Sequence, residues 1–275
     1  MNEIEDTHEE IDWSKWYNFQ GSMGIPIIHL GGARATEDLL ALCNITEESE
    51  VLDIGCGTGY TACKIAQKYN SHVVGIDISE DMIVKAQERA QQHHLKSIEL
   101  HIADVFDLPF QNETFDAVIM ESVLNLLPDE KREALVEIVR VLKPGGVLGA
   151  NEDFIYPETP DKVLNHLTAV LPIKTFFTPQ ELRQLFEDSG LEVVHCKENP
   201  SRGVITPKEI VNIIRTMGLV RFLSYSVRSM VDPDIRRIAR YYREGSNIMI
   251  KYKETRDFFG YALIIGRKMH DTKIY

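Results

Sequence analysis

A glycine-rich turn is the feature of this chain whose residue types and spacing best suit chemistry. The run VLDIGCGTG occupies residues 51–59, and its turn comprises Gly55, Cys56, Gly57 and Gly59. Glycines between a strand and a helix let a ligand approach the backbone closely. A dinucleotide site would have a third glycine at position 60, which here is Tyr60, and no lysine of a phosphate-binding loop follows. The turn therefore predicts a nucleotide-like ligand that is not held through phosphate groups.

Three aspartates stand at corresponding places around this turn. Asp53 precedes it, Asp77 ends the next β-rich run, and Asp104 follows a third. Carboxylates repel a pyrophosphate but attract a ligand that carries an ammonium and a sulfonium. Asp77 has two oxygens for the vicinal hydroxyls of a ribose, and Asp104 suits an adenine amino group. With Ile78 and Val105 placed to sandwich an adenine ring, the set predicts a cationic adenosine ligand.

These residues can form one site only if the fold brings the ends of their strands together. Between residues 50 and 198, short β-rich runs alternate with amphipathic helical stretches. Strands are predicted at 51–54, 72–78, 97–102, 115–120, from 147 and at 191–196, and helices at 60–69, 79–94, 128–142 and 178–190. This alternation predicts an α/β fold with a doubly wound parallel sheet. Its ligand is expected beyond the carboxyl ends of the strands, where the strand order reverses.

Residues 201–256 break this rhythm and predict a helical insertion before a last strand at 258–265. Thr206-Pro207 is expected to open a helix that runs to about Val231, and Asp232-Pro233 a second that runs to about Gly245. An apolar stripe follows one side of the first helix: Ile210, Ile213, Ile214, Met217, Val220, Leu223 and Val227. The stripe is expected to pack against the body; the alternatives are a lid over an apolar pocket and contact with a membrane surface.

Charge is distributed unevenly along the chain. The 275 residues carry a net charge of −12, whereas residues 201–256 hold twelve bases and five acids, a local net charge of +7. This stretch is expected to be a solvated helical face or a patch that attracts an anionic substrate or partner. The acidic total disfavours nucleic-acid binding.

Composition narrows the protein class further. The chain is 44% hydrophobic and 26% charged, which is typical of a globular protein. No apolar run is long enough to cross a membrane, and the acidic start MNEIEDTHEEID is no secretory signal, so a cytoplasmic location is expected. The four cysteines form no CxxC pair, and neither a disulfide framework nor a metal site is predicted.

Five runs together resemble a known family. VLDIGCGTGY, VVGIDIS, HIADVFDLPF, FDAVIMESVLNLL and VLKPGGVL, in this order, resemble the class I S-adenosylmethionine-dependent methyltransferases, and most of all their type 11 group of small-molecule enzymes. The resemblance implies a Rossmann-like, seven-stranded sheet whose last strand is antiparallel. It also implies S-adenosylmethionine as cofactor, bound by Asp53, Gly55, Cys56, Gly57, Gly59, Asp77, Ile78, Asp104, Val105 and Glu121.

The chain ahead of the core adds an expected lid. The run HLGGARAT, residues 29–36, is similar to the HPGG-type entry of some small-molecule members, with Leu30 in place of the proline. Aromatic residues crowd the segment before it: Trp13, Trp16, Tyr17 and Phe19. We therefore expect an N-terminal lid at 1–44, a cofactor-binding core at 45–200, a helical substrate cap at 201–256, and the final strand and tail at 257–275.

Methyl transfer from a sulfonium requires alignment of nucleophile, methyl carbon and sulfur. A general base is needed only if the acceptor must lose a proton. The candidate general bases are Glu121, Glu152 and His29, and after them Asp153 and His166. Glu152 and Asp153 are expected to follow the fifth strand.

The expected function is methyl transfer to a small molecule, anionic or partly apolar. The alternatives are C-methylation of an isoprenoid quinone or similar lipid, a cofactor-binding scaffold without transfer activity, and a nicotinamide dehydrogenase. Methylation of nucleic-acid bases is disfavoured because Glu-Ser-Val-Leu, not an Asn/Asp-Pro-Pro-aromatic clamp, follows the fourth strand. Arsenic methylation is disfavoured because two of the cysteines lie in the cofactor turn and its helix. No nucleic-acid partner and no integral membrane contact are expected, and the oligomeric state stays open.

Overall fold

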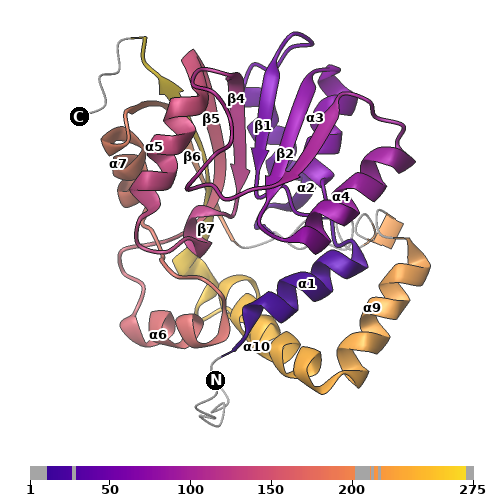
Figure 1. The fold of residues 1–275 in the computed structure, drawn as a ribbon. Coiled ribbons are helices and arrows are strands. Elements are labelled where there is room, and N and C mark those ends of the chain that lie inside the picture. Colours follow the sequence, from indigo (N-terminus) through magenta and orange to yellow (C-terminus); the bar gives the residue numbers. More distant parts are fainter. Residues whose placement is uncertain (1–10, 27–28, 202–210, 212–213, 216–217, 271–275) are drawn as a thin grey trace.

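The computed structural model describes residues 11–26, 29–201, 211, 214–215 and 218–270 (Figure 1). Its centre is a seven-stranded sheet with the order β3-β2-β1-β4-β5-β7-β6. The strands are β1 (Glu50–Ile54), β2 (His72–Asp77), β3 (Ile98–Ile102), β4 (Phe115–Glu121), β5 (Leu142–Ile155), β6 (Leu191–Pro200) and β7 (Phe259–Lys268). Strand β7 is antiparallel to both of its neighbours, and β1 to β5 are parallel. The predicted fold class is confirmed.

Strand β5 is longer than the sequence predicted. It begins at Leu142 rather than Val147, because the Lys-Pro-Gly-Gly run forms a bulge within the strand instead of preceding it. A Cβ at Gly146 would lie about 3 Å from two carbonyl oxygens of the neighbouring backbone, so only glycine fits there. The strand also continues to Ile155, which places Glu152 and Asp153 inside it, and the expectation that they follow it was wrong.

The helices between the strands largely match their predicted positions. They are α3 (Tyr60–Tyr69), α4 (Glu80–Gln92), α5 (Lys131–Val141) and α7 (Pro179–Asp188). Helix α6 (Asp161–Val170) and the 3-10 turns η1 (Leu124–Leu126) and η2 (Arg256–Phe258) had no predicted bounds. Ser79 caps α4, and Thr178 with Glu181 forms the capping box of α7. Helix α5 begins three residues later than predicted, because residues 128–130 form a turn to which Lys131 donates a hydrogen bond.

Apolar layers cover both faces of the sheet. Val51 and Leu52 are consecutive in β1, and both are fully buried, but they belong to different core clusters. Val51 packs in the layer that includes α2 (Gly32–Leu42) and α3, and Leu52 packs with α5 and α7. Because alternate side chains of a strand point to opposite faces, this burial explains the continuous apolar runs in the sequence.

The helical insertion and the first helix pack together beside the sheet (Figure 1). This cap consists of α1 (Trp13–Met23), α9 (Leu219–Val231) and α10 (Pro233–Ile250). Trp16 and Phe19 of α1 are buried with Ile235 and Ile238 of α10. Helix α10 continues five residues beyond its predicted end at Gly245, since that glycine packs against Leu171 where a Cβ would approach within 2.4 Å.

The predicted helix from Thr206 to Val231 is interrupted at Gly218, whose φ is 83°, and α9 begins at the next residue. The Thr206-Pro207 start and the stripe residues Ile210, Ile213 and Met217 lie outside the described residues. Val220, Leu223 and Val227 are exposed, so the expected packing of the stripe against the body is wrong for these three residues. No helix of the described ranges is long and apolar enough to cross a membrane.

Candidate functional site

The glycine turn lies at the carboxyl end of β1, and β1 is hydrogen-bonded to both β2 and β4. Gly55, Gly57 and Gly59 all have positive φ, between 53° and 75°. A Cβ at Gly59 would lie 2.8 Å from Ala86 of α4, so this glycine lets the turn pack on that helix. A Cβ at Gly57 would meet nothing within 4 Å, so this glycine faces open space. Cys56 is buried and packs beside Gly75 of β2.

Asp53 is buried at the end of β1, with 2% of its surface exposed. Its Oδ2 atom has no hydrogen-bond partner among the described residues. Burial raises the pKa of this carboxyl well above its usual range, and the nearby Glu121 raises it further, whereas a hydrogen bond from the Ala62 backbone acts against them. A buried acceptor without a partner is costly, and a cationic donor at this position would satisfy it.

Asp77 ends β2 and faces the same turn. Its Oδ2 accepts the backbone N–H of Gly57 at 3.0 Å, and its Oδ1 accepts that of Ser79 at 2.9 Å. These bonds fix the carboxylate, and each oxygen keeps a second lone pair. Burial raises the pKa of the Tyr17 hydroxyl on α1, and Tyr242 and Asp77 raise it further. The neighbouring Asn18 accepts a hydrogen bond from the Ser79 hydroxyl at 3.4 Å, so α1 lies beside the end of β2.

The predicted adenine residues lie farther along the same edge. Ile78 is 74% exposed, and Asp104 is exposed with its Oδ1 accepting the N–H of Phe106. Val105, in contrast, is buried in the apolar core beneath. Of these three residues, Ile78 is therefore the one that presents an exposed apolar side chain.

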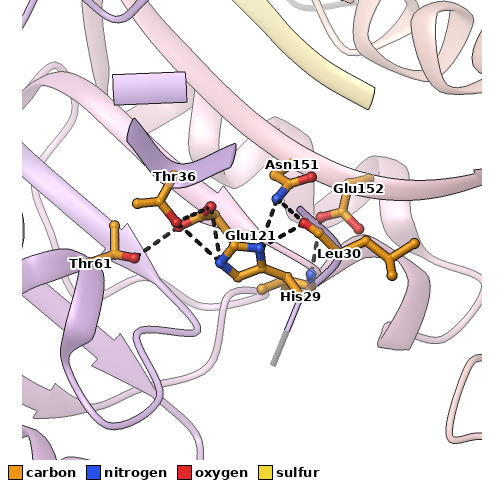
Figure 2. Close-up of polar contacts among 8 residues, drawn as sticks. His29, Leu30, Thr36, Thr61, Glu121, Asn151 and Glu152 are labelled. Carbon is orange, nitrogen blue, oxygen red and sulfur yellow. Dashed lines mark hydrogen bonds and ion pairs between the residues drawn. The ribbon is translucent and has the colours of Figure 1, made fainter. Parts of the chain in front are cut away.

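Glu121, at the end of β4, is the centre of a polar network that four segments build (Figure 2). Thr61 of α3 donates a hydrogen bond to its Oε1 at 2.8 Å, and Thr36 of α2 donates to its Oε2 at 3.0 Å. His29 Nε2 lies 3.3 Å from Oε2, and both side chains are less than 10% exposed. The network brings together two of the three predicted catalytic residues.

Asn151 of β5 orients His29 from the other side (Figure 2). Its Nδ2 donates to the carbonyl oxygen of Leu30 at 3.1 Å, which sets the direction of the amide. Nδ1 of His29 lies 2.9 Å from the same Nδ2 and 3.0 Å from the carbonyl oxygen of Leu30. Nε2, on the other side of the ring, faces Glu121 and Thr36.

Glu152, the third predicted catalytic residue, points to the opposite face of β5 from Asn151. It is fully buried, and its Oε1 accepts the backbone N–H groups of Val123 and Leu124 at 3.0 and 3.1 Å. Burial raises its pKa to about 8. This carboxyl holds the η1 turn that follows Glu121, and the structure does not bring it into the network of His29.

Asp153 shares the face of Asn151. Burial raises its pKa to about 7, against the opposing effect of His29, and its Oδ1 lacks a hydrogen-bond partner within the described ranges. His166, the remaining candidate, lies elsewhere: its Nε2 is 4.0 Å from Glu244 Oε1, between α6 and α10.

Three partners in the network escaped the sequence reasoning, namely Thr36, Thr61 and Asn151. Thr36 closes the HLGGARAT run and Thr61 is the second residue of α3, so each stands beside a motif that was identified. Asn151 carried no local signal. The described part of the chain contains no cluster of His, Cys, Asp and Glu that could hold a metal ion.

Comparisons with known proteins show which family and which fold this chain resembles. Residues 45–190 match a family model described as a methyltransferase domain. The chain is 29% identical over 170 residues to an O-methyltransferase, rstn1, of Aspergillus nomiae, covering 61% of this chain and 75% of that one. It is 30% identical to a demethylmenaquinone methyltransferase of Lactiplantibacillus plantarum, covering 62% and 81%. Among solved structures, the [4+2]-cyclase SpnF has a TM-score of 0.71 at 20% identity, covering 94% and 95%.

Proposed function

We infer the reaction from one premise: this chain belongs to the class I S-adenosylmethionine-dependent methyltransferases. The proposed reaction is transfer of the methyl group to a small-molecule acceptor. S-adenosylmethionine supplies a methyl group already activated on a sulfonium, so the protein's part is to bind, orient and exclude water. A cytoplasmic location and the division at residues 44, 200 and 256 stay predictions.

The observation that carries the proposal is the unpartnered Oδ2 of Asp53 beneath an open glycine turn. A carboxylate there would pair with the ammonium of the cofactor's methionine end, and the open space at Gly57 would admit the ligand. A phosphate-bearing dinucleotide fits poorly, because Asp77 contacts the backbone of Gly57 and Asp53 lies just before the turn, and their carboxylates would repel phosphates. The donor set thus suits a cationic nucleoside.

The remaining cofactor contacts follow the strand ends outward. Asp77 would accept both ribose hydroxyls through its free lone pairs. Ile78 would cover one face of the adenine, with Asp104 and Val105 at its edge. Gly55, Cys56 and Gly59 would shape the turn, and Glu121 would face the junction between cofactor and acceptor.

His29 and Glu121 are the proposed catalytic groups on the acceptor side. If the acceptor is a hydroxyl or an amine, this hydrogen-bonded pair would take its proton. Glu152 is proposed as a positioning residue, since its oxygens already hold the turn after Glu121. The partnerless oxygen of Asp153 lies on the same side as His29, and it would accept a further donor from the substrate.

A second candidate is C-methylation of a quinone-like ring. It is favoured by the relative whose name is demethylmenaquinone methyltransferase, at 30% identity. The O-methyltransferase relative favours a hydroxyl acceptor instead. The two candidates differ in the atom that receives the methyl group, so product analysis separates them.

The test is incubation of the full chain with methyl-labelled S-adenosylmethionine and a metabolite extract. We expect label in one or a few small molecules, and the position of the label then identifies the acceptor atom. Absence of transfer together with tight cofactor binding would favour a scaffold without activity. Binding of NADH but not of S-adenosylhomocysteine would overturn the proposal.

A further inference from the structure

The exposed side of α9 is a feature of the described chain that the proposed reaction does not use. Six apolar residues of this helix are each more than half exposed: Leu219 (62%), Val220 (77%), Leu223 (54%), Val227 (58%), Met230 (69%) and Val231 (72%). We call this set the α9 face. Contiguous exposed apolar surface on a folded protein usually marks an interaction site.

The six residues share one side of the helix. At 100° per residue they fall within an arc of about 120°. Ser226 and Ser229, which are partly buried, lie outside this arc. The apolar side is therefore turned away from the contacts of α9 with the rest of the cap, and Figure 1 shows α9 at the outer edge of the molecule, apart from the sheet.

Exposed basic side chains lie on α9 and on the adjoining α10. Arg228 is exposed on α9 itself, and Arg236, Arg240 and Arg243 form an exposed stripe along α10. No carboxylate within the described ranges forms an ion pair with these four arginines. Three acids close to them in sequence have other partners, since Asp232 caps α10, Asp234 pairs with Lys15 at 2.8 Å and Glu244 accepts a hydrogen bond from Tyr252 at 3.2 Å.

We propose that the α9 face docks the protein onto an anionic lipid surface, with the arginines of α9 and α10 contacting the headgroups. A helix with one apolar side and basic flanks lies in the interface of a bilayer rather than across it. Polybasic surfaces are attracted to anionic leaflets. The rest of the chain, which carries a net charge of −19, is repelled by the same surface, so the molecule approaches with its cap toward the membrane.

Charge also argues against a second copy of the chain as the occupant. Two chains that meet through their α9 faces would bring together two copies of residues 201–256, each with a net charge of +7. This repulsion is relieved by anionic headgroups and not by an identical cap. The proposal goes beyond the transfer reaction and does not depend on it.

The test is flotation of the full chain with two kinds of vesicle, phosphatidylcholine alone and phosphatidylcholine mixed with phosphatidylglycerol. We expect binding to the mixed vesicles only, weakened by added salt because the attraction is screened. The double variant Leu223→Glu with Val227→Glu should lower this binding about tenfold or more, since it loses apolar contact and gains negative charge. Glutamate is a good helix former, so α9 should persist in circular dichroism.

A matched control carries the same change of charge elsewhere. Val84→Glu with Val194→Glu alters two exposed valines of α4 and β6, and it should bind the mixed vesicles as the wild type does. Arg236→Gln with Arg240→Gln should reduce both the binding and its dependence on salt. Three outcomes would overturn the proposal: no binding by the wild type, equal binding by the α9 double variant, or a dimer in light scattering that this variant dissociates.

Discussion

The carboxylates near the ends of β1, β2 and β3, here called the β1 side, are held differently from those of β4 and β5, here called the β4 side. On the β1 side, Asp53 keeps an unpartnered oxygen, Asp77 keeps spare lone pairs, and Asp104 is exposed. On the β4 side, Glu121 and Glu152 are enclosed, and protein donors occupy their oxygens. An open set of acceptors suits a ligand that brings its own donors and charge.

The closed side suits a different task. A carboxylate held by Thr36, Thr61 and His29 cannot move to follow a ligand, so it presents a fixed geometry to whatever lies beside it. We propose that the acids on the β1 side capture the cofactor and that the β4 side aligns the acceptor.

His29→Gln should reduce methyl transfer about 10²–10⁴-fold if the acceptor must lose a proton, because the ring that links Asn151 to Glu121 is removed. Affinity for S-adenosylhomocysteine should stay unchanged. Label transfer and calorimetry measure the two quantities, and His101→Gln, at an exposed histidine of β3, is the control. A loss of cofactor affinity equal to the loss of transfer would show that the two sides do not divide the work.

Gly57→Asn should weaken cofactor binding about 100-fold, or roughly 2.8 kcal/mol, by filling the open space at the turn. Asparagine tolerates the left-handed conformation that Gly57 adopts, so the fold should survive. Gly218→Asn is matched to it, because Gly218 also has positive φ and open space around its Cα. If calorimetry gave both variants wild-type affinity, the ligand would not approach the backbone at Gly57.

Asp77→Ala should weaken cofactor binding by about 1.5–3 kcal/mol, the usual contribution of hydrogen bonds to a charged group. Asp104→Ala should cost less, because that carboxylate is exposed. The control is Asp116→Ala, which removes a carboxylate of β4 that accepts bonds from Glu50 and Lys143. An effect of Asp104→Ala greater than that of Asp77→Ala would reverse the order of the adenosine along the sheet edge.

Stability should fall as the pH rises from about 5 to 8. Burial raises the pKa of Asp53, of Asp153 to about 7 and of Glu152 to about 8, so the folded chain retains protons that the unfolded chain has released. Where the folded state binds more protons, the free energy of unfolding decreases with pH.

Asp53→Asn separates the effect of one acid from the others. It should recover about 1 kcal/mol or more of stability at pH 8, because the variant lacks a carboxyl whose ionisation favours the unfolded chain. Cofactor affinity should change with pH in the direction opposite to stability. It should rise with pH in the wild type as Asp53 ionises, and it should not change with pH in the variant. Urea unfolding and calorimetry at pH 5.5 and 8 check both; an identical pH dependence in the two proteins would contradict the account.

The sequence predicted those parts of the molecule that local signals determine. The glycine turn, the capping box at Thr178 and the helix capped by Ser79 are each specified by neighbouring residues, and each is present. The extension of α10 past Gly245 was missed because its cause is Leu171, far away in the chain. The early start of β5 was missed because a bulge needs the partner strand to define it.

The residues of the site also divide into those that a local sequence signal predicts and those that have no such signal. Asp53 and Asp77 were predicted from their places beside strand ends, which a sequence displays directly. The bonds of Glu121 to Thr61 and Thr36 span 60 and 85 residues, and that of Asn151 to His29 spans 122. No pattern within one segment encodes such contacts, and the exposure of the α9 face was hidden for the same reason.

The central claim is that the acids at the ends of β1 and β2 bind a positively charged sulfur nucleoside and exclude phosphate-bearing ligands. Calorimetric titration of the full chain with S-adenosylmethionine and with NADH tests it directly. The account predicts one bound S-adenosylmethionine per chain, with affinity about 100-fold weaker in Gly57→Asn, and no heat from NADH. Saturable binding of NADH, with none of S-adenosylmethionine, would contradict it.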